Sequence, residues 1–378
     1  ENGLHYSKVM DEVKATILAN EDAYDAMTLM AYNLMTTAQQ KMLFDVSALS
    51  AIRTDMPWWK ENAIRDMSIG PRSYMMIGDI NLMFYESYYA IFFNKAVADK
   101  FQIPDPYALV ADGKWTYDAY YGAAKQVSAD VNGDGAHTAD ADSFGVAMHS
   151  NAGQSMILAL GASPLTRDND GYPVYDGLSE AFIDAYGKIM TLYTDGAVTV
   201  KNGTAGVEKV DGGYQGVFKT DRALFMMEVL GTLPSLRDME SDYLILPVAK
   251  YDEAQSGYRS AVNVWATAYI SVPVTAVDEM TGVVTEALAY WSCKNMRPLA
   301  FDLTYKAKTV RDERSIEMLD GVFDNLYCSF AELYDFGGIS SVFWDVLSDG
   351  GEIASAVEKV TSKAEAAIAS FSEKWGAQ

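Results

Sequence analysis

The sequence predicts a layered α/β protein, and two kinds of apolar pattern carry that prediction. Apolar residues from Ile353 to Phe371 recur at three- and four-residue spacing, as they do along one face of an amphipathic helix. Shorter apolar runs, such as Tyr243–Leu246, have the length and the β-branched or aromatic content of strands. Helical and strand patterns alternate along the chain, and this alternation is typical of α/β folds.

The other elements follow from the same two patterns. Helical spacing predicts helices over residues 9–18, 178–193 and 283–291, the last following Gly282. Apolar runs over residues 146–148, 223–226 and 265–272 predict strands. No internal repeat, low-complexity tract or Gly/Ser linker is visible, so two lobes would have to be joined by strands or short crossovers.

Length and charge narrow the possible functions. The 378 residues suggest two to three domains or two large lobes. Lys and Arg number 29 against 52 Asp and Glu, and the resulting net charge of −23 argues against a nucleic-acid binder, which needs clustered cations. No apolar stretch reaches the roughly 18 residues that a membrane-spanning helix requires.

One segment has the pattern of a calcium-binding loop. Asp130, Asn132 and Asp134 place oxygen ligands at alternate positions before Gly135, as at the start of an EF-hand loop, and Ala136 would add its carbonyl. The twelfth position is Ala141, so a shifted Asp142 would have to close the site, with Asp140 as its competitor. We expect a structural calcium ion that stabilises a surface loop, and a metal-free acidic turn is the alternative.

Catalytic motifs are absent from the sequence. The three histidines are scattered, and we find no nucleophile elbow, phosphate-binding loop, dinucleotide fingerprint or zinc-protease motif. The sequence therefore predicts a protein that is not an enzyme. Paired carboxylates for glycoside hydrolysis stay open, because their separation is invisible in a sequence.

Aromatic residues are abundant, with 24 Tyr and 7 Trp. Adjacent pairs such as Trp58-Trp59 and Tyr88-Tyr89 have an apolar face and a polar tip, which suits them to cover a sugar ring. The same side chains are equally good core fillers, so this observation leaves both roles open.

Several segments together resemble the family 1, carbohydrate-type extracellular solute-binding proteins of bacterial ABC importers, in the version common in Firmicutes. The match runs almost continuously from about residue 20 to the C-terminus. It is carried by Ala23-Tyr24-Asp25, Met56-Pro57-Trp58-Trp59, residues 74–79, Phe93-Asn94-Lys95, Pro106-Tyr107, Gly113-Lys114-Trp115-Thr116, the Asp130 loop up to Phe144-Gly145, Ala223-Leu224-Phe225, Ile245-Leu246-Pro247, Lys250-Tyr251-Asp252-Glu253, Arg311-Asp312-Glu313 and Met318-Leu319.

The resemblance implies a two-lobed, periplasmic-binding-protein-like fold of type II, with an inter-lobe ligand cleft that closes like a hinge. On this basis we expect residues 1–90 and 265–320 to form lobe 1, and residues 91–264 and 321–378 to form lobe 2 with the C-terminal helices. The family normally has a strand, a helix and a second strand before the Tyr-Asp segment. We therefore expect lobe 1 to lack its opening strand and helix, which would leave a sheet edge exposed for pairing.

The resemblance also implies a ligand site. Trp265 and Trp344 would stack on a sugar ring, while Asp79, Asn151 and Glu228 would form hydrogen bonds with its hydroxyls. The remaining candidates are Met30, Tyr32, Asn33 and Gln154.

In functional terms, the resemblance implies an extracellular solute-binding component of an ABC importer that captures a mono- or oligosaccharide. We expect a monomer that passes its ligand to a membrane permease and is tethered at the cell surface by a lipid outside this chain. Two alternatives stay open. A glycoside hydrolase or lyase would turn its sugar over, and a receptor or adhesin for a basic protein would bind in a strongly salt-dependent way.

Overall fold

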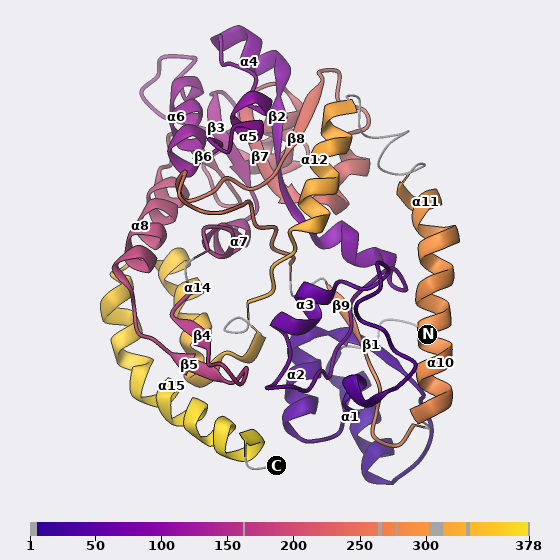
Figure 1. Cartoon of the computed structure of the whole chain (residues 1–378). Helices are drawn as coiled ribbons and strands as arrows, with labels where there is room; N and C mark the ends of the chain where they lie inside the picture. The colour runs from indigo at the N-terminus through magenta and orange to yellow at the C-terminus, as the bar shows by residue number, and fades with distance from the viewer. Residues whose placement is uncertain are drawn as a thin grey trace.

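The computed structural model describes residues 6–161, 163–263, 267–276, 278–301, 313–329 and 333–376. A five-stranded sheet forms the core of one lobe, and a two-stranded sheet lies in the other, here termed the smaller lobe (Figure 1). The strands are β1 Met27–Met30, β2 Tyr89–Asn94, β3 Phe144–Met148, β4 Leu165–Arg167, β5 Pro173–Tyr175, β6 Thr199–Val200, β7 Ala223–Val229, β8 Tyr243–Leu246 and β9 Ala268–Ser271. The helices are α1 Tyr6–Leu18, α2 Ala31–Gln39, α3 Glu61–Asp66, α4 Lys95–Phe101, α5 Tyr107–Ala111, α6 Tyr117–Val127, α7 Ala152–Ala159, α8 Glu180–Thr194, α9 Gly213–Lys219, α10 Asp278–Trp291, α11 Arg297–Ala300, α12 Glu313–Asp324, α14 Ile339–Asp349 and α15 Ile353–Gly376.

The larger sheet has the strand order β6-β3-β7-β2-β8. β3 is parallel to both β6 and β7, whereas β2 is antiparallel to β7 and β8. Every residue of β2, β3 and β8 is buried, because helices α4, α6, α9 and α12 pack against this sheet. Fully buried strands read as continuous apolar runs, which is why the sequence analysis found β3 and β8, whereas β2 was not predicted.

The predicted elements occur where the patterns placed them. β8 has the predicted bounds, and the predicted runs at 146–148 and 223–226 lie inside β3 and β7. α1, α8, α10 and α15 contain or overlap the four predicted helices, although α10 begins at Asp278, before Gly282. β9 occupies only part of the predicted strand at 265–272, and residues 264–266 lie outside the described residues.

The smaller sheet consists of the antiparallel pair β1 and β9. Single bridges extend it on the far side of β9, where Met76 pairs with Ile270 and Leu43 with Pro273. Helix α1 covers this lobe through Met10 and Val13, both of which are buried. Among the described residues, β1 therefore has a partner on one edge only.

Three chain segments, near Tyr88, Val262 and Leu326, connect the two lobes and lie side by side. Tyr88 forms a bridge with Val262, and Ser260 forms one with Leu326. These segments lie close to the expected lobe boundaries, and the full assignment of residues to lobes stays a prediction.

One part of that assignment differs from the structure. Residues 313–320 were expected in lobe 1, but they belong to α12, which packs against β8 of the larger sheet. The Ser315 Oγ accepts a hydrogen bond of 3.1 Å from the Ile245 N–H, and Leu319 is buried. A helix with apolar residues on one face can cover either sheet, so its position depends on contacts that the sequence does not reveal.

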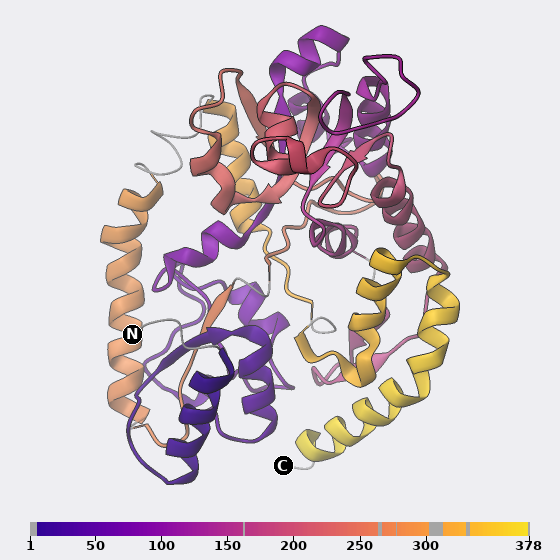
Figure 2. The ribbon, with the colours of Figure 1, turned by 180° about the vertical axis from the view of Figure 1, so that it is seen from behind.

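Helices α14 and α15 pack on α7, α8 and β5, and the end of α15 reaches the smaller lobe (Figure 2). There the Lys374 Nζ donates to the Gln39 carbonyl, and the Trp375 ring lies 5.3 Å from that of Tyr74. The β4–β5 hairpin reaches the same lobe, because the Arg167 guanidinium donates to the carbonyls of Arg65, in the last turn of α3, and of Ser68, just after it.

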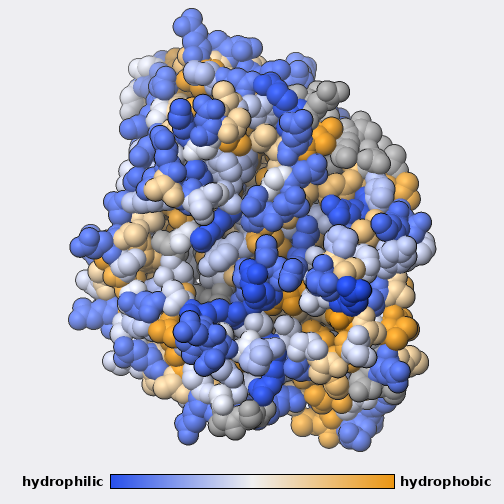
Figure 3. Space-filling view, in the orientation of Figure 1, coloured by the Kyte–Doolittle hydropathy of each residue, from blue (hydrophilic) through white to orange (hydrophobic). Residues whose placement is uncertain are grey.

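The face of the molecule seen in Figure 3 is mostly hydrophilic, with hydrophobic residues gathered toward the lower right. Within the described ranges, no helix combines the length and apolar character needed to cross a membrane. No disulfide joins Cys293 and Cys328, of which only Cys328 is buried.

Candidate functional site

The carboxyl ends of β3 and β7 bring several polar side chains to one edge of the larger sheet. The two strands are parallel neighbours, and Met148 lies opposite Met227. Asn151 follows the end of β3, and Glu228 is the penultimate residue of β7. Parallel strands place their carboxyl ends at the same edge, where α/β folds commonly bind ligands.

Glu228 is held in place by a neighbouring tyrosine. The Tyr214 hydroxyl, from α9, donates to Glu228 Oε2, and Gln215 Nε2 donates to the Tyr214 oxygen at 3.3 Å. The second carboxylate oxygen accepts from the Val229 N–H at 2.8 Å. Burial, together with the charge of Glu228 and the hydrogen bond to it, raises the pKa of Tyr214 well above its ordinary value. The tyrosine is therefore a hydrogen-bond donor throughout the physiological pH range.

His149 and Asn151 lie at the same edge. The His149 ring is 6.2 Å from the Tyr214 ring, in an edge-on arrangement. Its Nδ1 accepts a hydrogen bond of 3.1 Å from the Asn151 N–H, which leaves Nε2 for another partner. Both residues are half-buried. The edge thus offers amide, imidazole, phenol and carboxylate groups, which suit the recognition of neutral hydroxyls.

Two of these residues were not among the sequence candidates. Tyr214 and His149 lie far apart in sequence, and only the packing of α9 beside β3 and β7 brings them together. His149 had one usable signal, because it directly follows a buried strand. Tyr214 had none, since a tyrosine in a short helix is typical of core packing.

On the smaller lobe, Met30 and Asn33 lie at the start of α2. Asn33 is 6% exposed, and its side-chain Nδ2 has no hydrogen-bond partner among the described residues. A buried amide without a partner costs about 1–3 kcal/mol, so this group is available for a ligand or water. The side chains of Tyr32 and Gln154 and the whole of Trp265 lie outside the described residues.

Asp79 lies inside the smaller lobe rather than on a ligand-accessible surface. It is 1% exposed, and its carboxylate accepts from the Tyr85 hydroxyl at 2.6 Å and pairs with the Arg297 guanidinium at 3.5 Å. Burial also lowers the pKa of the neighbouring Lys60, with the charge of Arg297 adding to the effect. A ligand would have to displace one of these partners, so the contact expected for Asp79 stays a prediction.

The aromatic candidates have different roles. The indole N–H groups of Trp58 and Trp59 both donate to the Glu286 carboxylate on α10, at 3.0 and 2.8 Å. This pair therefore anchors α10. Trp344 is half-buried on α14, which packs against α7, the helix that follows Asn151.

The side chains expected to bind calcium accept hydrogen bonds from the backbone of their own loop. Asp130 accepts from the N–H groups of Gly133 and Gly135, and the other two donors, Asn132 and Asp134, accept from the backbone two residues on. Asp142 is fully buried and accepts from the N–H groups of Val131 and Thr138.

Asp140 is directed to another partner, because its carboxylate pairs with Lys209 Nζ at 2.9 Å. Among the described residues, no group of three or more His, Cys, Asp or Glu side chains is placed to hold a metal ion. The types of the oxygen ligands and their order in the sequence fit calcium. Calcium binding stays a prediction.

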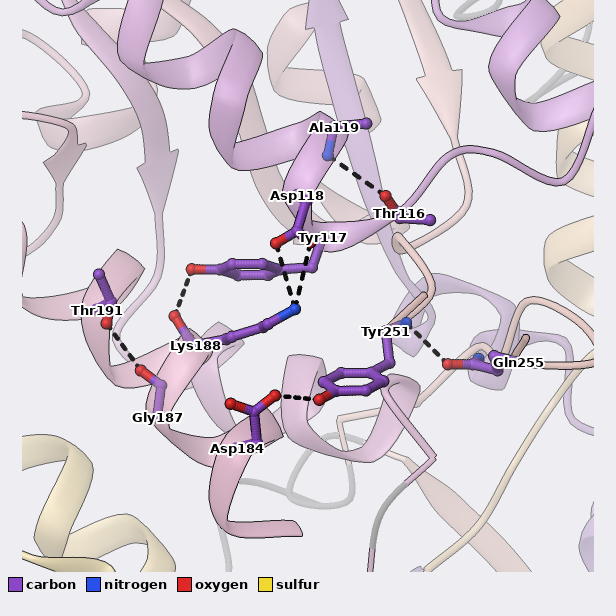
Figure 4. Close-up of polar contacts among 10 residues, drawn as sticks. All are labelled: Thr116, Tyr117, Asp118, Ala119, Asp184, Gly187, Lys188, Thr191, Tyr251 and Gln255. Atoms are coloured by element: carbon purple, nitrogen blue, oxygen red, sulfur yellow. Dashed lines mark hydrogen bonds and ion pairs between the residues drawn. The ribbon is translucent and has the colours of Figure 1, made fainter. Parts of the chain in front are cut away.

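A separate polar cluster joins α6, α8 and the loop after β8 (Figure 4). Lys188 Nζ lies 3.3 Å from Asp118 Oδ1 and 4.6 Å from the centre of the Tyr251 ring, while the Tyr251 hydroxyl donates to Asp184. Each polar group in the cluster has a protein partner. The cluster therefore fastens α8 to its neighbours.

Two cavities, of about 750 and 270 Å³, lie where the β4–β5 hairpin meets the segment after α3. Both are lined by Asp66 and Arg167, and neither contains a predicted ligand residue. The Arg167 guanidinium is already bound to backbone carbonyls, which indicates a structural role.

No protein-family model matches the chain, and no curated protein matches it. Many solved structures do match the chain in fold. An ABC substrate-binding protein of Listeria monocytogenes in complex with cycloalternan is 15% identical, with a TM-score of 0.56 over 99% of this chain and 90% of that one. UgpB from Mycobacterium tuberculosis, in complex with glycerophosphocholine, is 14% identical with a TM-score of 0.64, covering 97% of this chain and 89% of UgpB.

The maltose/maltodextrin-binding domain MalE from Bdellovibrio bacteriovorus, bound to maltotriose, is 12% identical with a TM-score of 0.58, and the match covers 97% of this chain and 90% of that domain. At this identity the likeness concerns the fold. The chain thus has the two-lobed α/β fold of the ABC-transporter substrate-binding proteins, as the sequence resemblance implied.

Proposed function

We propose that this protein is the extracellular solute-binding component of an ABC importer, that it captures a carbohydrate between its lobes, and that it passes the sugar unchanged to a membrane permease. The observation that carries the proposal is the edge formed by β3 and β7. In a chain with the substrate-binding-protein fold, that edge gathers His149, Asn151, Tyr214 and Glu228. Structural neighbours crystallised with cycloalternan and maltotriose support a sugar as the ligand.

The chemistry of the edge fits capture without turnover. Both oxygens of Glu228 already accept hydrogen bonds, one from the Tyr214 hydroxyl and one from the Val229 N–H. Uncharged hydroxyls bound by amides, phenols and one carboxylate should show little dependence on salt. Export to the cell surface, a lipid tether outside this chain and a monomeric state are parts of the same proposal.

A thermal-shift screen against mono- and oligosaccharides tests the proposal. A ligand at a hundredfold excess over its Kd stabilises the folded state by about 2.7 kcal/mol, which gives a readily measured rise in Tm. We expect one class of sugar to raise the Tm and to be recovered intact. Hydrolysed sugar would favour the glycosidase alternative, and a shift only with basic proteins at low salt would favour the receptor alternative.

A pair of variants ties the binding to the edge. Glu228→Gln keeps the shape but removes the charge, and we expect affinity for the sugar to fall about 10- to 150-fold, since hydrogen bonds to charged groups contribute about 1.5–3 kcal/mol. Glu373→Gln, on the exposed side of α15, is the control and should leave affinity unchanged. Equal affinities for both variants would place the ligand elsewhere.

We also propose that calcium binds the loop at 130–142 and stabilises it, with Asp130, Asn132, Asp134, the Ala136 carbonyl and Asp142 as ligands. Calcium should raise the Tm of the chain without sugar, and a chelator should reverse the rise. Asp130→Asn should abolish the effect, whereas Asp140→Asn should preserve it because Asp140 pairs with Lys209. The same Tm in calcium and in chelator would leave the segment as a metal-free turn.

A further inference from the structure

The lobes touch at a second place, which involves none of the three segments that connect them. The β4–β5 hairpin belongs to the larger lobe, because the Tyr175 hydroxyl lies 3.3 Å from that of Thr361 on α15, and α15 packs on α8. From this hairpin, the Arg167 guanidinium donates to the carbonyls of Arg65, at 2.7 Å, and of Ser68 in the smaller lobe. Both views of the chain place the end of α15 beside the smaller lobe as well (Figures 1 and 2). Two elements of the larger lobe therefore reach across to the smaller one.

The two backbones come into direct contact at the tip of the hairpin. The Gly70 N–H donates to the Gly171 carbonyl at 3.3 Å. Both glycines have a positive φ, of +56° and +85°. A Cβ on Gly171 would lie 3.1 Å from the Gly70 carbonyl oxygen, and a Cβ on Gly70 would lie 2.8 Å from the Tyr172 ring carbon Cζ. The lobes can approach this closely because both positions are glycine.

The end of α15 adds to this contact through Trp375. The Trp375 carbonyl accepts hydrogen bonds from both lobes, from the Tyr172 hydroxyl of the hairpin at 3.2 Å and from the Arg72 guanidinium of the smaller lobe at 3.5 Å. The Trp375 side chain is buried, and its ring lies 5.3 Å from that of Tyr74 in the smaller lobe. The hairpin and the end of α15 are thus linked to each other and contact the smaller lobe together.

Two cavities flank this contact, so the lobes do not share a continuous core there. The larger cavity, of about 750 Å³, is lined by Gly70 from the smaller lobe and by Tyr172 from the hairpin. The smaller one, of about 270 Å³, is lined by Arg167 of the hairpin and by Tyr327 of a connecting segment. Packed protein interiors contain few voids larger than a water molecule. The contact can therefore open without disrupting the core of either lobe.

We propose that the hairpin and the end of α15 form a clamp that holds the two lobes together when no solute is bound and that releases when the lobes separate. The clamp consists of Arg167, Gly171, Tyr172 and Trp375. It sets the fraction of chains whose lobes are open to an arriving solute, because each contact that exists only in the closed arrangement shifts the population toward that arrangement. The bonds from Arg167 contribute most to this shift, since hydrogen bonds from a charged donor are stronger than neutral ones.

Hydrogen exchange and small-angle X-ray scattering of the full chain without sugar test the clamp. Arg222→Ala is the control for Arg167→Ala, because Arg222 is also half-buried and donates to the Ala139 carbonyl within the larger lobe. The wild-type scattering curve should fit the closed structure. Exchange of the Gly70 amide should be about tenfold or more faster in Arg167→Ala and unchanged in Arg222→Ala. A wild-type curve that fits only separated lobes, or equal exchange in all three chains, would overturn the proposal.

Two glycines give a second matched pair of variants. Gly177 has a φ of +76°, close to that of Gly171, but a Cβ there would meet no atom within 4 Å. Gly171→Ala and Gly177→Ala therefore strain the backbone alike, and only Gly171→Ala pushes against the smaller lobe. We expect a larger radius of gyration for Gly171→Ala and the wild-type value for Gly177→Ala, with circular dichroism confirming that both fold. The same radius for both variants would contradict the clamp. Because no sugar is used, a failed sugar screen would leave this result standing.

Discussion

At the scale of single residues, side chains of the same chemical type have different roles because their neighbours differ. Asp79 and Glu228 are both buried acids nominated by the family resemblance. Asp79 pairs with Arg297 inside the smaller lobe, whereas Glu228 is held by Tyr214 at the edge of the larger sheet. The residue type indicates what a group can bind, and its neighbours decide whether it is free to do so.

Two tyrosine–glutamate hydrogen bonds allow this effect of burial to be measured. Tyr214→Phe leaves the buried Glu228 without its donor and should lower the free energy of unfolding by about 1–3 kcal/mol. Tyr24 donates to Glu12 at 3.3 Å in an exposed position, so Tyr24→Phe should change it by less than about 0.5 kcal/mol. Urea denaturation measures both values, and similar losses for the two variants would show that burial is not the cause.

The cluster in Figure 4 predicts a shifted titration. The hydrogen bond to Asp184, with some burial, raises the pKa of Tyr251 to about 12. Because the pKa of Tyr251 is higher in the folded chain than in the unfolded chain, Tyr251 stabilises the fold fully below pH 10. This contribution is lost as the pH rises from 10 toward 12. Asp184→Asn should return the pKa toward 10, as followed by NMR of labelled tyrosine. A Tyr251 that still titrates near 12 in this variant would exclude Asp184 as the cause.

At the scale of elements, close packing restricts where glycine can be replaced. Gly145 lies in β3 where α6 crosses it, and a Cβ there would overlap the carbonyl oxygen of Ala124. Gly122 lies in α6 itself, and a Cβ there would meet no atom within 4 Å. The close contact between α6 and β3 therefore requires Gly145 but does not require Gly122.

Alanine substitution should reveal that difference. Gly145→Ala should destabilise the protein by about 1–3 kcal/mol because α6 must move away from the sheet. Gly122→Ala should stabilise it by up to about 1 kcal/mol because alanine favours the helix. Thermal unfolding of both variants measures the signs. Destabilisation by Gly122→Ala would show that α6 packs more tightly on that face than the structure indicates.

Four helices and four strands were predicted from the sequence, because burial imprints a period on each of them, whereas the other elements, such as β2, were not predicted. The strands β3 and β8 are apolar throughout, β7 is apolar up to Met227, and α15 repeats its apolar positions over 24 residues. The placement of α12 was not predictable, since its apolar face fits more than one sheet. The site was predicted in part. Asn151 and Glu228 lie together at one edge, whereas His149 and Tyr214 joined them only through the packing of α9.

At the scale of the whole molecule, many tyrosines are buried. Burial raises the pKa of Tyr88, Tyr120 and Tyr334 well above 10. In the unfolded chain these phenols ionise near pH 10, so their contribution to stability is complete below that pH and decreases as the pH rises above it.

Alkaline titration should therefore proceed in two stages. Absorbance at 295 nm should show the exposed tyrosines ionising near pH 10, and the buried ones ionising only when the far-ultraviolet circular dichroism reports unfolding. The total should reach the 24 tyrosines of the sequence. A single transition near pH 10 with the fold intact would contradict the burial of these residues.

The sequence by itself determined the class of the fold, the positions of four helices and four strands and, through its resemblance, the kind of protein to look for. It could do so because secondary structure and burial follow local periodicity. Tertiary structure alone decided which polar groups meet at the carboxyl ends of β3 and β7, which partners bind Asp79 and Asp140, and which sheet α12 covers. Contacts between distant segments depend on how the elements pack, and local periodicity does not encode that packing.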